Sequence, residues 1–219
     1  MLEDRILFID GEAVILDKPA GLAVHPGPST PRSLEDHLAD LRFGFRRSPA
    51  PVHRLDRDTS GCLLLSRNPK AHKRFAAEFE AGRVVKTYLA ILDGTPADTE
   101  GVIDLALAKI SSREAGWRMV PDARGQRAVT HWQQVGQANG RALVRFRPET
   151  GRTHQLRVHA ASGIGLPILG DPVYGRPSGF QMLLHAASLR LERGDKPPVE
   201  ATAPLPLAFA NAGFGDAGL

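Results

Sequence analysis

Two carboxylates and three basic side chains lie within six residues at the start of the segment HRLDRDTSG, residues 53–61. Such a polar loop, ended by glycine and followed by the apolar run CLLLS, can hold a reactive group on a rigid strand. Asp56 follows Leu55 and lies near cations, so it can be partly buried and still ionised. Asp58 is expected to accept backbone N–H bonds two or three residues on. Asp58 would then shape the loop, and Asp56 would be left to react. The simpler alternative is a salt-linked surface turn.

The segment GRTHQLRVHA, residues 151–160, is predicted to be a strand because apolar Leu156 and Val158 alternate with polar residues. One face would pack on the core, and the other would present Gln155, Arg157 and His159 as hydrogen-bond donors. An arginine there could pair with a carboxylate in fork geometry, or form only a cross-strand ion pair. Two histidines in this segment, five residues apart, would lie on opposite faces, which favours structural or RNA-contacting roles over a metal site.

In the segment KTYLAI, residues 86–91, a strand would place Lys86, Tyr88 and Ala90 on one face. A lone tyrosine usually packs in a core or at its rim. Beside a carboxylate and an arginine, Tyr88 could instead stack on a nucleic-acid base.

The elements that must position these segments can be predicted from local signals. Asp10-Gly11 between two apolar runs predicts a β-hairpin, and the Pro- and Gly-rich residues 18–32 predict a loop. Ser33 is expected to cap a helix with an apolar stripe at Leu34, Leu38 and Leu41. A second helix is expected between Asn68 and Gly82, with Pro69 in its first turn.

Strands are expected at residues 84–92, 142–146, 156–158 and 182–184. They outnumber the helices and do not alternate with them regularly. This pattern indicates an α+β fold with a curved, mixed but largely antiparallel sheet flanked by helices. Residues 1–219 are expected to form a single domain, with a Pro-rich tail over 194–219 that lies on the domain as coil or edge strand and frays at its end.

Composition narrows the function classes. The 219 residues include one cysteine, Cys62, so an intrachain disulfide and a thiolate zinc site are excluded and a reducing cytoplasm is expected. No apolar run approaches the roughly 20 residues of a membrane span, and the early acids argue against a secretory signal. The net charge is +4, and residues 141–159 alone hold five arginines and one glutamate. That concentration favours phosphate contact over a merely solvated face.

Four ordered segments resemble the signature motifs of RluA-type RNA pseudouridine synthases: HRLDRDTSG, GRTHQLRVH, LGDPVYG (169–175) and LLHA (183–186). The opening ILFIDGEAVILDKPAGLAVHPG, with its KPAGL turn, is also similar to the start of that family. The resemblance spans roughly residues 5–207 and implies an α+β catalytic fold with a basic central cleft.

The resemblance implies roles for individual residues. Asp56 would be the catalytic aspartate, Tyr88 would stack on the target uracil, and Arg157 would pair with Asp56 and fix its position. Arg54 would take the place of the extruded base in the RNA stack. The remaining residues expected to bind substrate are His53, Arg57, Arg152, His154, Gln155 and, as part of the pocket wall, Leu184.

The reaction that the family performs breaks the N1–C1′ bond of uridine, rotates the base and rejoins it through C5. It involves no redox change, so no cofactor and no metal are expected. The uracil must leave its stack, which predicts base flipping into a pocket. Because the hairpin and KPAGL arrive within twenty-two residues, no N-terminal S4-type domain is expected. The expected partner is a stem-loop of rRNA or tRNA, with no membrane, no obligate protein partner and a monomeric state.

Two other functions stay open at this point. An RNA-binding protein without catalysis would make no product. An RNA hydrolase using Asp56 and Asp58 as paired acids or metal ligands would cut the chain or release the base. Two carboxylates two residues apart make a poor metal cage without further acids.

Overall fold

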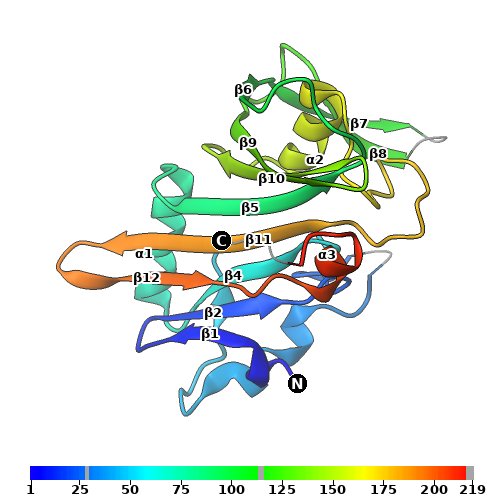
Figure 1. Cartoon of the computed structure of the whole chain (residues 1–219). Helices are drawn as coiled ribbons and strands as arrows, with labels where there is room; N and C mark the ends of the chain where they lie inside the picture. Colours follow the sequence, from blue (N-terminus) through cyan, green and yellow to red (C-terminus); the bar gives the residue numbers. More distant parts are fainter. Residues whose placement is uncertain (28–29, 113–115, 216–219) are drawn as a thin grey trace. The chain divides into compact units, whose positions relative to one another are not determined.

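The computed structural model describes residues 1–27, 30–112 and 116–215. Part of the loop expected at 18–32 and the end of the tail therefore lie outside the described residues. Contacts divide the chain into two compact units. Unit 1 comprises Met1–Lys86 and His185–Pro204, and unit 2 comprises Thr87–Leu184 and Leu205–Leu219. Each unit is built around its own portion of sheet (Figure 1).

The sheet of unit 1 begins with the predicted hairpin. Strands β1 (Ile6–Ile9) and β2 (Ala13–Lys18) are antiparallel, and the Asp10 carboxylate accepts hydrogen bonds from the backbone N–H groups of Glu12 and Ala13, both at 2.8 Å. Next in order come β4 (Ser60–Ser66), β11 (Leu184–Arg193) and β12 (Lys196–Thr202), while the short β3 (Ala50–Pro51) also pairs with β4.

Helix α1 (Pro69–Glu80) packs on this sheet, as its caps predict. Asn68 Oδ1 accepts a hydrogen bond from Ala71 N at 2.9 Å, and Gly82 just past the end has a φ of +71°. Phe75 is fully buried in the core of unit 1, which also contains Ile15, Leu64 and Leu189.

The helix expected after Ser33 differs from the prediction. The Ser33–Asp36 capping box is present, but the segment forms two 3-10 turns, Leu34–His37 and Asp40–Arg42. Leu34 and Leu41 are buried as the apolar stripe predicts, and Phe43 ends the second turn in the left-handed conformation.

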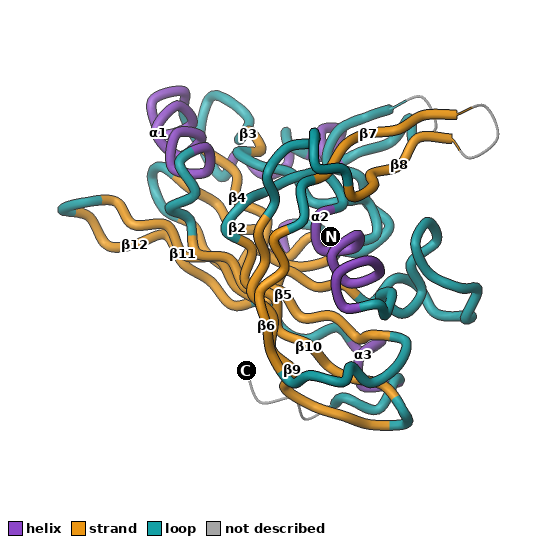
Figure 2. Tube along the Cα trace, turned by 90° about the horizontal axis from the view of Figure 1, so that it is seen from above, coloured by secondary structure: helices purple, strands orange, loops and turns teal. Residues whose placement is uncertain are grey.

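Unit 2 contains a four-stranded antiparallel sheet in the order β5 (Val85–Leu92), β10 (Arg141–Pro148), β9 (Val129–Ala138) and β6 (Glu100–Asp104). Strands β7 (Leu107–Ser112) and β8 (Gly116–Pro121) form a separate antiparallel ribbon (Figure 2). The core lies on one face of the larger sheet and includes Ala90, Val144, Phe146 and Leu156. The strands expected at 84–92 and 142–146 are therefore confirmed.

Two predictions for this part of the chain are wrong. Residues 155–158 form the short helix α2 (Gln155–Val158), not a strand, and a π-helical turn, His159–Ile164, follows directly. All four residues of α2 are buried. The alternation of polar and apolar residues in this segment therefore does not correspond to one exposed face and one buried face. Of the strand expected at 182–184, only Leu184 is in β11, although Leu183 N donates to Leu169 O.

The tail is more ordered than expected. Pro197 and Pro198 lie in β12, which pairs only with β11 among the described strands, as the edge-strand alternative predicts. Residues Leu207–Asn211 then form helix α3, which no local signal indicated. None of the helices in the described residues is long and apolar enough to cross a membrane.

Candidate active site

The loop at 53–61 is anchored through its main chain in unit 1. The Nζ atom of Lys18 is buried and donates hydrogen bonds to three backbone carbonyls, those of Pro19 (2.8 Å), Leu22 (2.8 Å) and Arg57 (3.0 Å). The Arg57 carbonyl also accepts a bond from Gly21 N at 2.9 Å. The KPAGL turn is thus tied directly to the residue that follows Asp56.

The Lys18 ammonium also contributes to the electrostatics of the loop. Burial lowers the pKa of Lys18 to about 8, although the carboxylates of Asp58, Asp56 and Asp17 favour its charged form. Asp56 itself is half-buried, and its main-chain oxygen accepts a hydrogen bond from Thr59 N at 3.1 Å. The reactive carboxylate proposed from the sequence therefore lies in a turn closed by main-chain hydrogen bonds and near a buried cation.

Asp58 does not act as predicted. Its carboxylate accepts hydrogen bonds from the Arg57 guanidinium at 2.9 and 3.1 Å, on the exposed side of the loop, and it caps no backbone N–H among the described residues. Lys18 and the main chain perform the shaping that had been expected of Asp58.

The two ends of the loop are held by close contacts with neighbouring elements of unit 1. The imidazole of His53 stacks on the Phe79 ring with centroids 4.4 Å apart and accepts a hydrogen bond from Leu64 N at 3.0 Å. At the other end, Gly61 has a φ of +102°, and a Cβ there would lie 2.2 Å from the Ala186 carbonyl oxygen. Only glycine allows this approach between β4 and β11. Arg54 is exposed between these two anchors.

In unit 2, Arg157 is a buried cation held in fork geometry. Its Nε and one of its terminal nitrogens donate to the two carboxylate oxygens of Asp171, each at 2.8 Å, and Arg157 is only 5% exposed. Burial alone would raise the pKa of Asp171, but Arg157 and the backbone N–H groups of Val173 and Tyr174 hold that pKa below its usual value.

A second group of contacts surrounds this pair. The Tyr174 ring lies 5.2 Å from the Arg157 guanidinium, and its hydroxyl is 2.9 Å from His154 Nδ1. His154 has a φ of +53° and also faces the Trp117 ring, at 4.9 Å. Asp171 and Tyr174 belong to the segment LGDPVYG, whose resemblance to a family motif was the only sequence signal for them.

The side chain of Gln155 fixes the turn before α2. Its Oε1 accepts from Thr150 Oγ1 (2.8 Å) and Arg152 N (2.9 Å), while its Nε2 donates to Val129 O and Thr130 Oγ1, both at 3.0 Å. All four hydrogen-bonding positions of the amide are filled within the protein. Arg152 itself is exposed and donates from Nε to the Arg127 carbonyl.

Tyr88 lies half-buried on β5, directly opposite Phe146 of β10, and packs against the core of unit 2. Leu184 is buried in that core with Leu156 and Met182. The second histidine of the segment, His159, is fully buried and bonds to Thr130 Oγ1 at 2.9 Å. Within unit 2, the predicted residues Tyr88 and Leu184 thus lie at one core, which also contains Leu156, the neighbour of Arg157. The pairing of Arg157 with Asp56 stays a prediction.

Within the parts of the chain that the structure describes, no three His, Cys, Asp or Glu side chains are arranged to hold a metal ion. Cys62 is buried in unit 1, and burial raises the pKa of its thiol to about 12. Lys18, Asp171 and Tyr174 are the residues that analysis of single side chains missed. The first is signalled only by KPAGL and the other two only by LGDPVYG.

Comparison with known proteins identifies the class. Residues 12–162 match the family described as RNA pseudouridylate synthase. An uncharacterized RNA pseudouridine synthase of Zymomonas mobilis is 58% identical over 217 residues, which cover 98% of this chain and 99% of the relative. The ribosomal large subunit pseudouridine synthase D of the same organism is 40% identical over 78% of this chain and 56% of its own length.

A solved structure shows the same fold. Human RNA pseudouridylate synthase domain containing 4 superposes with a TM-score of 0.80 at 28% identity, covering 96% of this chain and 92% of its own. The chain therefore belongs to the RluA-type RNA pseudouridine synthase family and has its α+β fold. It is an isomerase that acts on uridine in RNA.

Proposed function

We propose that this enzyme converts one or more uridines in a stem-loop of rRNA or tRNA to pseudouridine, with Asp56 as the catalytic residue. The observation that supports this most strongly is the anchoring of the loop at 53–61. Lys18 holds the main chain next to Asp56, while Asp58 is engaged with Arg57 at the surface. A carboxylate held in this way is placed for attack or proton transfer without a large reorganisation.

In the proposed reaction the N1–C1′ bond breaks, the uracil turns, and C5 bonds to C1′. The proton on C5 leaves to solvent, and N1 gains a proton, so the product is an isomer of the substrate. Asp56 acts either as nucleophile or as base. The uracil is flipped from its stack and lies on Tyr88, while Arg54 fills the gap in the RNA. No cofactor is required, because no electrons leave the substrate.

The other predicted residues divide between surface and interior. Exposed Arg57 and Arg152 contact RNA phosphates in this proposal, and His154 borders the same surface. His53 and Gln155 act from within, because their hydrogen-bonding groups hold the loops that carry Arg54 and Arg152. Leu184 forms part of the pocket wall. We further propose that the enzyme acts in the cytoplasm as a monomer.

The deciding experiment is tritium release. RNA carrying 5-tritiated uridine is prepared from cells that lack this protein. The purified protein is then incubated with this RNA in the absence of added metal or cofactor. We expect release by the wild type and by Asp58→Asn, and none by Asp56→Asn. Equal activity of Asp56→Asn and wild type would contradict the role of Asp56. RNA binding without release from rRNA and tRNA pools would favour the non-catalytic function, and metal-dependent strand scission would favour the hydrolase.

The proposed role of Arg157 needs a variant that keeps its charge, since Arg157→Ala would leave Asp171 buried without its partner. Arg157→Lys keeps the charge but cannot form the fork to Asp171. If Arg157 positions Asp56, turnover should fall at least tenfold more than RNA affinity. Equal losses in turnover and affinity would instead make Arg157 a residue that binds RNA.

A further inference from the structure

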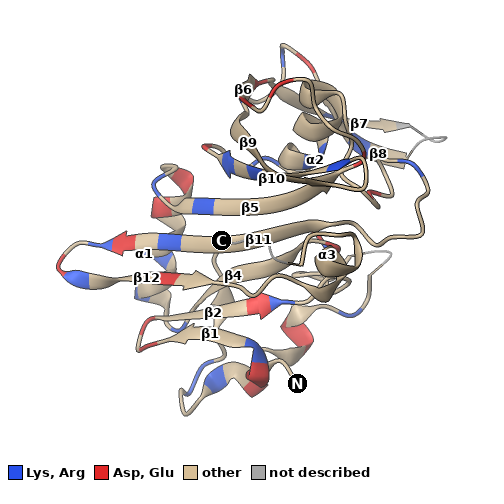
Figure 3. Cartoon of the chain, in the orientation of Figure 1, with Lys and Arg blue, Asp and Glu red and all other residues tan. Residues whose placement is uncertain are grey.

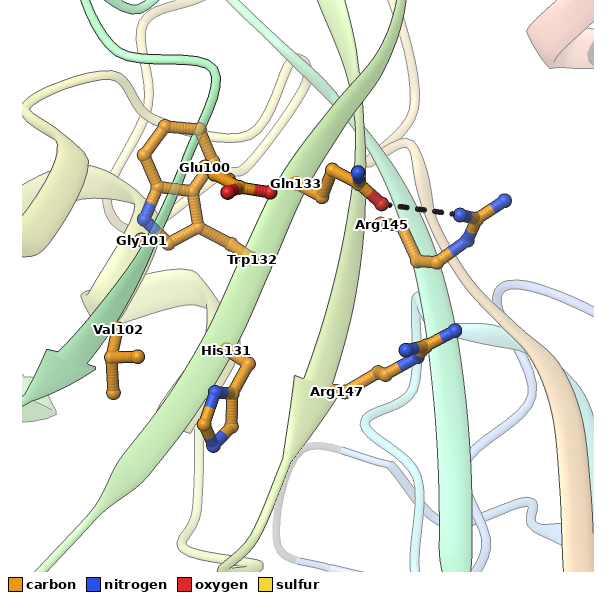
Figure 4. A pocket seen from close by; sticks show the side chains of 8 residues that line it. All are labelled: Glu100, Gly101, Val102, His131, Trp132, Gln133, Arg145 and Arg147. Atoms are coloured by element: carbon orange, nitrogen blue, oxygen red, sulfur yellow. Dashed lines mark hydrogen bonds between the residues drawn. The ribbon is translucent and has the colours of Figure 1, made fainter.

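Unit 2 carries a polar groove of about 430 Å³ over strands β6, β9 and β10 (Figure 4). Its polar and exposed lining comes from Glu100, Val102, His131, Gln133, Arg145 and Arg147. The strand register accounts for this arrangement: Arg145 lies opposite Gln133, and Arg147 lies opposite His131. The groove has the volume of a small-ligand site, but it is open and polar.

The groove lies on the other face of the sheet from Tyr88. Directly opposite residues of antiparallel strands share a face, so Phe146 and Tyr88 point to the same side, into the core of unit 2. Arg145 and Arg147 flank Phe146 and therefore point to the opposite side. The groove is thus separate from the pocket proposed for the uracil.

The described part of the C-terminal segment covers one end of this second face. Phe214, just after α3, is buried and lies 3.7 Å from the position that a Cβ on Gly136 would take, beside Leu143. Two residues farther along β10 from Leu143, the face is open at Arg145, and Val102 at the β6 edge is 60% exposed. The open end is therefore the end that carries Arg145 and Arg147.

The charges of the groove leave positive groups available. Arg147 is exposed and makes no hydrogen bond or ion pair with any residue in the described ranges, and Arg145 makes one long contact, 3.4 Å, to Gln133 Oε1. The nearby Glu149 is already bound by His131 at 2.7 Å and approached by Arg127 at 3.8 Å. Basic residues recur along β10 (Figure 3) and continue through Arg127 to Arg152.

We propose that this groove binds the phosphodiester backbone of the RNA substrate, outside the part that holds the target uridine. Side chains two residues apart on a strand are separated by roughly 6.6 Å, which suits successive phosphates along a nucleic-acid strand. Guanidinium groups bind phosphate oxygens in fork geometry. RNA is favoured over an acidic protein because the enzyme's substrate already carries a continuous row of phosphates. The inference rests on RNA as the partner and extends the proposed function with a second contact surface.

The first test removes the two charges. The double variant Arg145→Gln/Arg147→Gln is compared with Lys70→Gln/Lys73→Gln, which removes two exposed charges from α1. Binding of purified ribosomal RNA is measured from 50 to 300 mM salt. If both arginines contact phosphate, the slope of log affinity against log salt should become shallower by about 1.4 to 1.8, and the affinity near 0.1 M salt should fall about tenfold or more. The double lysine variant should show less than half of the loss in RNA affinity that the double arginine variant shows.

A second measurement locates the RNA directly. Cys62 is buried, so a cysteine introduced at Val102 can carry a photo-crosslinker with little competing label, and Ile9→Cys gives an exposed control in unit 1. We expect RNA crosslinks from position 102 well above those from position 9. Wild-type affinity and slope in the arginine variant, with no excess crosslinking at 102, would overturn the inference and leave an acidic protein as the ligand to test. Because both assays measure binding, they stay informative if no pseudouridine is formed.

Discussion

The centre of the loop at 53–61, around Asp56, is held by its main chain, whereas the segment at 151–160 is held by its side chains. Lys18 binds the backbone of the first, and Asp56 and Arg54 are left half-buried and exposed, respectively. In the second, Gln155 and Arg157 are buried, and the amide and guanidinium bind remote groups. Both segments are short, charged and begin or end with glycine.

This difference has energetic consequences. A buried charge or amide that loses its partner keeps the cost of desolvation, so the second segment should be sensitive to any change in a partner. An exposed ion pair such as that of Arg57 and Asp58 contributes little, because water replaces either partner. Variants can therefore test whether the first segment depends on hydrogen bonds to its main chain and the second on its buried side chains.

The largest effect on stability is expected from Asp171→Asn. This change takes from the buried Arg157 the carboxylate that binds it in fork geometry, which should lower the free energy of unfolding by about 3 to 5 kcal/mol. Urea denaturation followed by circular dichroism measures it. A loss below about 1 kcal/mol would mean that water or another group reaches Arg157, and the segment would not depend on its buried fork.

A smaller effect is expected from Lys18→Met, which removes the buried donor shared by three backbone carbonyls, of which, among the described residues, only that of Arg57 keeps another bond, from Gly21 N. Unsatisfied acceptors should lower the free energy of unfolding by about 2 to 3 kcal/mol. Turnover should also fall, with kcat reduced more than KM is raised, because the loop next to Asp56 loses its anchor. Lys70→Met, on the exposed face of α1, is the control. An unchanged kcat in Lys18→Met would mean that the hydrogen bonds of Lys18 do not contribute to catalysis.

Each region also contains a buried neutral histidine. His185 is bound to Ser60 Oγ at 2.9 Å at the end of the first loop, and burial lowers its pKa to about 4. Burial likewise lowers the pKa of His159 in the second region. Between about pH 6.5 and 4 the unfolded chain binds more protons than the folded one, so stability should fall as the pH falls through this range.

The variant His185→Gln keeps a polar side chain at this position but does not titrate in this range. It should make the unfolding free energy depend less on pH between about 6.5 and 4, and His53 and His159, whose pKa values are also lowered by burial, account for the dependence that is left. Urea denaturation at several pH values measures the difference. His72→Gln, on the half-buried face of α1, is the comparison. An undiminished slope in His185→Gln would mean that His185 is protonated in the folded protein.

The smallest effect is expected from Asp58→Asn. Among the described residues the Asp58 carboxylate accepts hydrogen bonds only from the exposed Arg57 guanidinium, and its charge also favours the charged form of Lys18. The free energy of unfolding should therefore fall by less than about 1 kcal/mol. Tritium release should stay within about threefold of the wild type. If Asp58→Asn lost as much tritium release as Asp56→Asn, both carboxylates would be needed for activity. That result would favour the hypothesis in which Asp56 and Asp58 act as paired acids.

The features that could be predicted from the sequence depend on neighbours along the chain. The turn at Asp10-Gly11, the Asn68 cap and the Gly82 exit of α1 are each set by residues within a few positions. The segments 84–92 and 142–146 are rich in Val, Ile, Leu and aromatic residues, which favour strands. The family resemblance depended in the same way on motifs that are contiguous in the sequence. The roles it implied for Asp56, Tyr88 and Arg54 stay predictions.

The features decided only by the tertiary structure depend on partners far along the chain. Residues 155–158 have the alternation of a strand but form a helix, because Val129, Thr130 and Asp171 satisfy their polar groups inside the protein. The need for glycine at position 61 arises from the Ala186 carbonyl, 125 residues away. A pattern of residue types shows which side chains are polar, but whether a polar side chain is buried depends on which distant groups the fold brings to it.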